Sequence, residues 1–393
     1  MSGGPDTTSA ARPSGPALVS HVRAAHGPEL SGAIERVVAP FGGWQAVVKP
    51  GERIAVKVNL LRAAAPEQAV TTHPETLRWV LRGIKEAGAT PFVADSPGGP
   101  NPAAKVARAW RVSGLAALCT AEGVELIDVD SDPAELVCPE GLLFRSFPVG
   151  RSFLEADGMV QVGPLKTHVL MRLTGAVKLT FGCVPGLVKA GLHVRASKRE
   201  DFADMLLDLH FGLRPRFSII DGIIAMEGQG PGGGKPRELG SLFAAADALA
   251  LDAALADRTA HRRSDIYVLA AGQRRGLIDL DHPYELVGDP IEAATDFVPA
   301  VKDADGMMPG MFRGVARRLM AGRPGLVDAQ ACTQCGDCES ICGARAIKLA
   351  PAPVFNDDAC VRCYACAEVC PNGALDVVTP AMARFLGGLR RKR

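Results

Sequence analysis

Residues 332–342 read CTQCGDCESIC, and residues 360–370 read CVRCYACAEVC. Each stretch has the cysteine spacing C-x2-C-x2-C-x3-C, and the second begins 28 positions after the first. The similarity continues beyond the last cysteines, because residues 343–347 (GARAI) align with residues 371–375 (PNGAL). The segment is therefore an internal duplication, and it predicts a small module with pseudo-two-fold symmetry.

This spacing is suited to cubane iron–sulfur clusters. Gaps of two residues let three thiolates surround one corner of a cluster, and the fourth ligand then comes from the other repeat. We therefore predict two [4Fe–4S] clusters, one held by Cys332, Cys335, Cys338 and Cys370, and one by Cys360, Cys363, Cys366 and Cys342. A zinc site is the alternative, but zinc takes four ligands, usually as two separated pairs, and fits eight cysteines in a dense repeat badly.

The module resembles the bacterial two-cluster ferredoxins over about fifty residues. It departs from that family at Gly343, where the family usually has Pro. The resemblance implies that the module passes electrons through its clusters. No flavin or nicotinamide fingerprint occurs in the chain, so we expect the electron donor or acceptor to be another protein.

Bulk composition excludes some classes of partner. The 393 residues carry a formal net charge of +1, so no overall basic field is available to neutralise the phosphates of a nucleic acid. Aromatic residues make up 5% of the chain, too few to favour stacking platforms for single strands. We expect no nucleic-acid partner.

Targeting signals and membrane spans are not expected. Residues 1–16 lack an apolar core and read as a disordered tail rather than a signal peptide. The longest apolar stretch, residues 241–256, is interrupted by two aspartates, so no membrane span is predicted. Eleven cysteines are then more consistent with metal binding in a reducing cytosol than with disulfides, which predicts a cytoplasmic protein.

The region before the cysteines has an alternating pattern typical of an α/β fold. Residues 53–60 (RIAVKVNL) read as a buried strand, and Thr72 with Glu75 reads as the capping box of a helix. Residues 90–95 read as the next strand, which completes a β-α-β unit in a largely parallel sheet. Further strands are predicted at residues 124–129, 158–163, 216–221 and 265–270, and an amphipathic helix around residues 202–209.

These patterns predict the domain organisation. We expect an α/β main domain over residues 17–300, and a linker with a short basic helix over residues 301–326. The two-cluster ferredoxin domain should span residues 327–379, with a basic C-terminal tail at residues 380–393.

Polar residues follow several of the predicted strands. In open α/β sheets ligands bind outside the carboxyl ends of the strands. Lys166 and Lys178 could therefore hold an anionic group, and His168 could donate a proton. Asp221 and Glu227 could orient a ligand or a metal. The glycine-rich run at residues 228–234 matches no phosphate-binding fingerprint, so it could equally be a plain loop.

Four segments carry a second resemblance, at residues 162–168 (VGPLKTH), 174–182 (TGAVKLTFG), 220–228 (IDGIIAMEG) and 246–252 (ADALALD). Together they resemble the family called domain of unknown function 362, over roughly residues 50–260. Members of that family often carry a ferredoxin-like tail. The resemblance implies a fold and a site, but no substrate.

Three functions are compatible with these patterns. The first is an iron–sulfur oxidoreductase that passes electrons to a small molecule in the α/β domain, for which the two lysines favour an anion. The second is a non-enzymatic electron carrier, and the third is a redox sensor that binds a metal or a nucleotide. Turnover of a bound small molecule would separate the first from the other two.

Overall fold

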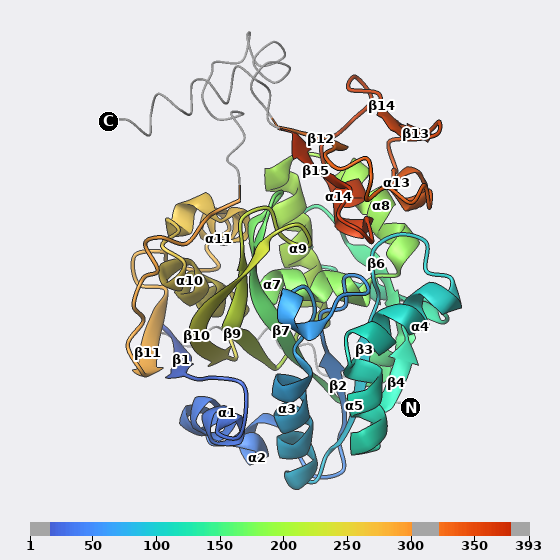
Figure 1. The fold of residues 1–393 in the computed structure, drawn as a ribbon. Coiled ribbons are helices and arrows are strands. Elements are labelled where there is room, and N and C mark those ends of the chain that lie inside the picture. The colour runs from blue at the N-terminus through green and yellow to red at the C-terminus, as the bar shows by residue number, and fades with distance from the viewer. Residues whose placement is uncertain (1–15, 301–321, 379–393) are drawn as a thin grey trace.

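The computed structural model describes residues 16–300 and 322–378 (Figure 1). Nearly all of the predicted N-terminal tail, the predicted basic helix of the linker and the predicted basic C-terminal tail lie outside these described residues.

A nine-stranded sheet forms the centre of the main domain. Its order is β11 (Tyr284–Gly288), β1 (Ala17–Arg23), β10 (Lys235–Ala245), β9 (Phe217–Glu227), β7 (Gly158–His168), β2 (Arg53–Lys57), β3 (Thr90–Asp95) and β4 (Glu125–Asp128), with β8 (Arg172–Thr174) paired to β7. The strands from β9 to β4 are parallel, whereas β10 runs antiparallel to both of its neighbours. The predicted α/β class with a largely parallel sheet is confirmed.

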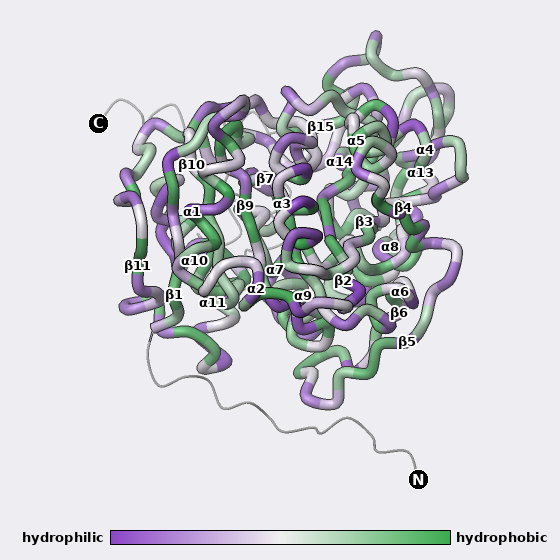
Figure 2. The backbone as a smooth tube through the Cα atoms, turned by 90° about the horizontal axis from the view of Figure 1, so that it is seen from below, coloured by the Kyte–Doolittle hydropathy of each residue, from purple (hydrophilic) through white to green (hydrophobic). Residues whose placement is uncertain are grey.

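Alternation along the strands separates two hydrophobic cores. Ile54 and Val56 of β2 point to one face, and Ala55 points to the other. The first face is covered by α1 (Leu30–Val38), α3 (Pro74–Glu86) and α5 (Leu115–Glu122), and the second by α7 (Ala176–Leu179), α9 (Arg199–Leu213), α10 (Ala248–Arg258) and α11 (Tyr267–Arg274). Figure 2 shows that hydrophobic stretches concentrate in the centre of the molecule.

Smaller elements complete the main domain. They are α2 (Trp44–Val47), α4 (Ala103–Val112), the hairpin of β5 (Pro133–Val137) and β6 (Ser146–Gly150), α6 (Arg151–Glu155) and α8 (Gly186–Arg195). Of these, α8 lies beside the C-terminal module (Figure 1).

Two local predictions were wrong. The segment predicted as a strand at residues 265–270 contains the start of helix α11, in which Val268, Leu269 and Ala271 are buried at helical spacing. A short apolar run cannot distinguish a strand from a buried helix. Helix α3 is capped by His73 rather than Thr72, because the Thr72 hydroxyl instead donates to the carbonyl oxygen of Val162 at 2.8 Å.

The C-terminal module consists of two short antiparallel pairs and two short helices. Strand β12 (Arg323–Leu326) pairs with β15 (Leu375–Val378), and β13 (Ile347–Leu349) pairs with β14 (Pro353–Phe355). The helices are α13 (Asp337–Ser340) and α14 (Ala365–Val369). Strand β12 therefore places residues 323–326, which the sequence pattern assigned to the linker, within this module.

The duplication seen in the sequence is also present in the backbone. Residues with positive φ occur in three pairs at the repeat distance: Gln334 and Arg362, Gly336 and Tyr364, Arg345 and Gly373. Asp328 and Asn356 form a fourth pair, since each side chain accepts hydrogen bonds from the backbone N–H groups two and three residues later. The two halves thus share one backbone conformation.

The module docks on α8 through a glycine. A Cβ atom added to Gly343 would lie 2.6 Å from the carbonyl oxygen of Ala190, closer than real Cβ atoms approach. Gly343 stands where two-cluster ferredoxins usually have Pro, and this contact gives the physical reason for the departure. The sequence change fits the module to the main domain.

Replacing Gly343 with Ala should loosen this docking. Overpacking of this kind typically costs about 1–3 kcal/mol, which corresponds to roughly 5- to 160-fold faster opening of the interface. Amide hydrogen exchange of α8 in anaerobically purified protein measures this change. Gly191→Ala is the matched control, because a Cβ atom there meets nothing within 4 Å. Equal exchange rates in the two variants would show that Gly343 does not fix the docking.

Candidate functional site

The eight cysteines of the repeat line two cavities. One cavity of about 340 Å³ is lined by Cys332, Cys335, Cys338 and Cys370, and another of about 400 Å³ by Cys342, Cys360, Cys363 and Cys366. We call these the outer and the inner cysteine cavity. The structure groups the thiols in the crossed arrangement that the spacing predicts, with one cysteine of each set contributed by the other repeat. Four thiols around one space are the donor set that a cubane cluster needs.

Backbone amides also reach two of the sulfurs. The N–H of Ala346 donates to Sγ of Cys342 at 3.1 Å, and the N–H of Ala374 donates to Sγ of Cys370 at 3.2 Å. These are the two crossing cysteines, and the two bonds are equivalent in the repeat. Hydrogen bonds to the sulfur ligands are one of the terms that set a cluster's potential.

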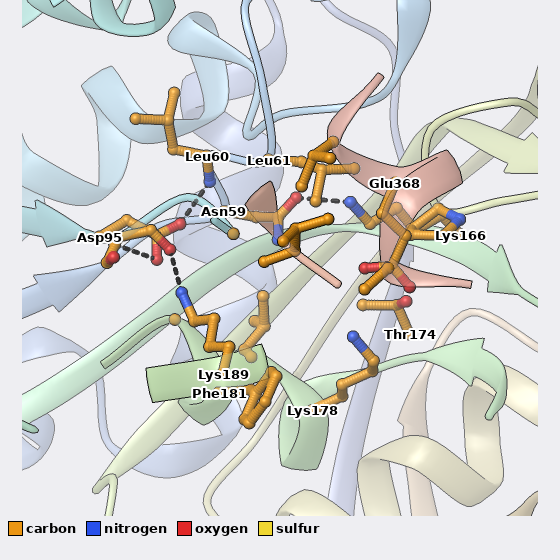
Figure 3. A pocket seen from close by; sticks show the side chains of 18 of the residues that line it. Asn59, Leu60, Leu61, Asp95, Lys166, Thr174, Lys178, Phe181, Lys189 and Glu368 are labelled. Atoms are coloured by element: carbon orange, nitrogen blue, oxygen red, sulfur yellow. Dashed lines mark hydrogen bonds between the residues drawn. The ribbon is translucent and has the colours of Figure 1, made fainter. Parts of the chain in front are cut away.

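A third cavity, of about 650 Å³, lies where the module meets the sheet (Figure 3). Asn59, Asp95 and Lys166 reach it from the carboxyl ends of β2, β3 and β7. The chain continues from β2 to β3 in one direction and from β7 to β9 in the other, so this is the topological switch point of the sheet. We call it the lysine cavity.

One buried ion pair stands at its edge. Nζ of Lys57 lies 3.0 Å from Oδ1 of Asp95, and both side chains are almost completely buried. Asp95 also accepts hydrogen bonds from the N–H groups of Leu60 and Ser96. A Cβ atom at Gly182 would overlap both members of the pair, so the glycine leaves room for it.

Two further lysines are held by neutral acceptors. Nζ of Lys166 donates to Oδ1 of Asn59 at 2.6 Å and to the carbonyl oxygen of Val70 at 2.9 Å. Nζ of Lys189, in α8, donates to the carbonyl oxygens of Ser96 and Pro97. Burial lowers the pKa of Lys166 to about 7 and that of Lys189 to about 8.

Lys178 makes no hydrogen bond and no ion pair with any residue that the structure describes. It lines the lysine cavity from α7, with its ammonium group 5.8 Å from the centre of the Phe181 ring. Burial lowers its pKa. Thr174 lies on the same side of the cavity (Figure 3), and its buried hydroxyl has no partner among the described residues.

A carboxylate of the module closes the cavity. Glu368 of α14 lines it, and Oε1 lies 3.1 Å from Nε2 of His168, although the two groups are not aligned as a hydrogen bond. Nδ1 of His168 accepts from the N–H groups of Leu170 and Met171, which leaves the proton of the neutral ring on Nε2. Burial lowers the pKa of His168 to about 4, so the ring is neutral at physiological pH.

The lysine cavity and the inner cysteine cavity share a wall. His193, Ile341 and Ala365 line both of them. The His193 ring stacks on Phe202 with centroids 4.6 Å apart, and its Nδ1 has no partner among the described residues. Burial lowers the pKa of His193 to about 4.

The structure brings together only some of the predicted site residues. Lys166 and Lys178 line one cavity, and His168 reaches it through Glu368. Asp221 and Glu227 lie elsewhere. Asp221 accepts from Thr76 on the opposite face of the sheet and pairs with His26, and Glu227 accepts from the N–H of Val298 at 3.0 Å.

Lys166 and His168 are both buried, with exposed fractions of 1% and 0%. They therefore cannot be replaced by Ala without a stability cost. Among the described residues, no group of three or more His, Cys, Asp and Glu side chains is placed to hold a single metal ion.

Three lining residues were missed by reasoning from the sequence, namely Lys189, His193 and Glu368. Lys189 and His193 belong to α8, whose polar residues lie on a helix face and follow no strand. Glu368 lies between two of the cysteines, in a region that we assigned wholly to the clusters from the sequence pattern. A search for charged residues within apolar stretches could have indicated Lys189, but nothing in the cysteine spacing distinguishes Glu368.

The chain combines an α/β domain, which has a cavity at the switch point of its sheet, with a ferredoxin-type module that closes this cavity. Its class is therefore that of an iron–sulfur protein built from two parts. Comparison with known families gives the particular assignment. The chain belongs to the family described as domain of unknown function (DUF362), whose model matches residues 54–257. Residues 322–375 match a 4Fe-4S dicluster domain, so the module carries [4Fe–4S] cluster chemistry and transfers electrons.

Two individual proteins are similar to this chain. The thylakoid-associated protein sll1697 of Synechocystis is 34% identical over 276 residues, which cover 66% of this chain and 82% of that protein. The lactate racemase apoprotein of Thermoanaerobacterium thermosaccharolyticum is 13% identical with a TM-score of 0.38, over 58% of this chain and 54% of that one. Within the described residues, no helix has the length and apolar composition needed to cross a bilayer.

Proposed function

We propose that this protein is an oxidoreductase in which two [4Fe–4S] clusters exchange electrons with an anionic small molecule bound in the lysine cavity. The observation that carries the proposal is the shared wall of His193, Ile341 and Ala365. A single layer of side chains separates the space for a ligand from four cysteine thiols. When bound, the clusters supply electrons one at a time.

The residues of the lysine cavity provide what else the reduction of a bound anion requires, namely positive charge and a proton. Lys178 and Lys166 present ammonium groups to an anion, and the module excludes water from that side of the site. With a pKa of about 7, Lys166 can hold or release a proton near neutrality, as reduction of a bound molecule requires. His168 then orients Glu368 rather than acting on the ligand directly.

The outer cysteine cavity is the natural entry for an external redox protein. Cys335 is exposed, whereas Cys366 of the inner cavity is buried. A partner protein therefore reaches the outer set of thiols more easily, and the inner set faces the lysine cavity. This arrangement supports a protein on one side and a small molecule on the other.

Reoxidation of the reduced protein tests the proposal. Anaerobic protein reduced with dithionite should be reoxidised by the anionic small-molecule fraction of a cell extract, followed as the return of absorbance near 400 nm. Lys178→Met should slow this at least about tenfold, because one cation-to-ligand contact of about 1.4 kcal/mol is lost.

Lys49→Met, on the exposed surface of the main domain, is the control and should react like the parent protein. Reoxidation by the protein fraction alone, with no effect of Lys178→Met, would instead identify an electron carrier without a substrate of its own.

A further inference from the structure

The charges around the lysine cavity do not balance. Three ammonium groups line it, those of Lys166, Lys178 and Lys189, and the Lys57 ammonium lies at its edge. Two carboxylates face them, those of Asp95 and Glu368. Both histidines nearby are neutral, so full protonation of the four lysines leaves an excess of two positive charges among the residues that line the cavity and its edge.

The carboxylates cannot remove this excess, because both are already engaged. Asp95 pairs with Lys57 and accepts backbone N–H groups, and Glu368 lies against His168. Among the described residues, Lys166 and Lys189 hydrogen-bond only to neutral oxygens. A third carboxylate, that of Asp130, acts on Lys189 from outside the lining, but it already accepts from the N–H of Gly186 and the hydroxyl of Ser96. Burying unpaired cations is expensive, so a compensating anion is the simplest way to complete the site.

Unpartnered polar groups point to where that anion would bind. Lys178 has no hydrogen-bond or ion-pair partner, and the Thr174 hydroxyl, 2% exposed as a residue, has none either among the described residues. Figure 3 shows both on the same side of the cavity as Lys166. A buried hydroxyl without a partner is uncommon, and a ligand atom would satisfy it.

We infer that the lysine cavity binds a small dianion, either a tetrahedral dianionic group or a pair of carboxylates, with Lys178 and Thr174 as contacts. The inference deepens the proposed function, since it states the charge class of the molecule that the clusters would serve. Because Glu368, Ile341 and Ala365 belong to the module, the site is complete only when the module is docked.

Protonation adds a second, independent readout. The lowered pKa values of Lys166 and Lys189 should rise when an anion binds, so the protein should take up protons from the buffer. Binding should therefore be tighter at pH 6.5 than at pH 8.5, because the lysines are already charged at the lower pH.

Calorimetric titration of the anaerobic holoprotein with sulfate, succinate and acetate tests the inference. Sulfate and succinate stay dianionic from pH 6.5 to 8.5, and at least one should bind ten times more tightly than acetate. Which of the two binds distinguishes a tetrahedral group from paired carboxylates. Titration in buffers of different ionisation enthalpy should show uptake of roughly one proton at pH 8.5.

Two variants test whether the dianion binds at Lys178 and Thr174. Lys178→Met should weaken dianion binding at least tenfold. Thr174→Val should weaken it several-fold while leaving the fold intact, because the hydroxyl it removes has no partner in the described part of the chain. Lys49→Met should bind like the parent protein. Equal affinities of the two variants and the control would place the anion elsewhere and overturn the inference.

The possible failures are distinguishable. If neither dianion binds more tightly than acetate, the inference is wrong, although small-molecule reoxidation of the clusters would still support the proposed function. If a dianion binds as described but no anionic molecule reoxidises the reduced protein, the proposed function is wrong and the binding site remains.

Discussion

Replacing Cys370 with Ser should remove the cluster held by Cys332, Cys335 and Cys338 and spare the other one. Cys370 follows the second repeat, but its thiol lines the outer cysteine cavity with the thiols of the first. A serine hydroxyl is a poor substitute for a thiolate ligand, so iron should fall from about eight to about four atoms per chain. Iron and sulfide analysis of anaerobically purified protein measures this.

The matching variant is Cys342→Ser, which should remove the cluster of the inner cavity instead. The two variants should therefore have similar iron contents but different electron paramagnetic resonance spectra after reduction. Cys119→Ser, in the buried core of the main domain, should keep the full iron content. Loss of the second-motif cluster in Cys370→Ser would show that each repeat binds its own cluster.

Replacing Asp95 with Ala should destabilise the main domain by about 3–5 kcal/mol, the usual cost of leaving one charge of a buried pair without its partner. Lys57 has 0% exposure and, within residues 16–300 and 322–378, would keep only the carbonyl oxygen of Val58 as an acceptor. Urea unfolding of anaerobic protein, followed by circular dichroism, measures the change in the free energy of unfolding.

Two further variants separate the ion pair from other causes. The double variant Lys57→Met with Asp95→Leu removes both charges and should recover much of the lost stability, because a well-packed apolar pair can replace a buried ion pair. Asp132→Ala breaks the exposed contact with Arg151 and should change little. If Asp95→Ala alone proves neutral, the pair is not a source of stability.

The sequence is sufficient to predict that polar residues at the ends of several strands lie close together. Asn59, Asp95 and Lys166 each follow or end a run of apolar residues, and parallel strands bring their carboxyl ends to one edge. The crossed grouping of the eight cysteines follows in the same way from their spacing. In both cases a short-range pattern determines the long-range contact.

The remainder of the site depends on contacts that no local pattern encodes. Glu368 reaches the cavity only because α14 docks beside α8, and that docking is visible in the sequence solely as glycine at position 343. Asp221 shows the reverse error. Asp221 lies in the predicted strand, which is β9. Because successive side chains of a strand point to opposite faces of the sheet, its carboxylate points toward Thr76 of α3 and away from the lysines.

The two halves of the module have diverged where they serve the main domain. The counterpart of Glu368 in the first half is Ser340, and the counterpart of Gly343 in the second half is Pro371, at the same repeat distance of 28 residues that separates the positive-φ pairs. A ferredoxin module transplanted from another protein would therefore supply all eight thiols, but the proline that the family usually has at position 343 would meet α8. The main domain and the module are matched at this position, so an exchanged module has to keep a glycine there.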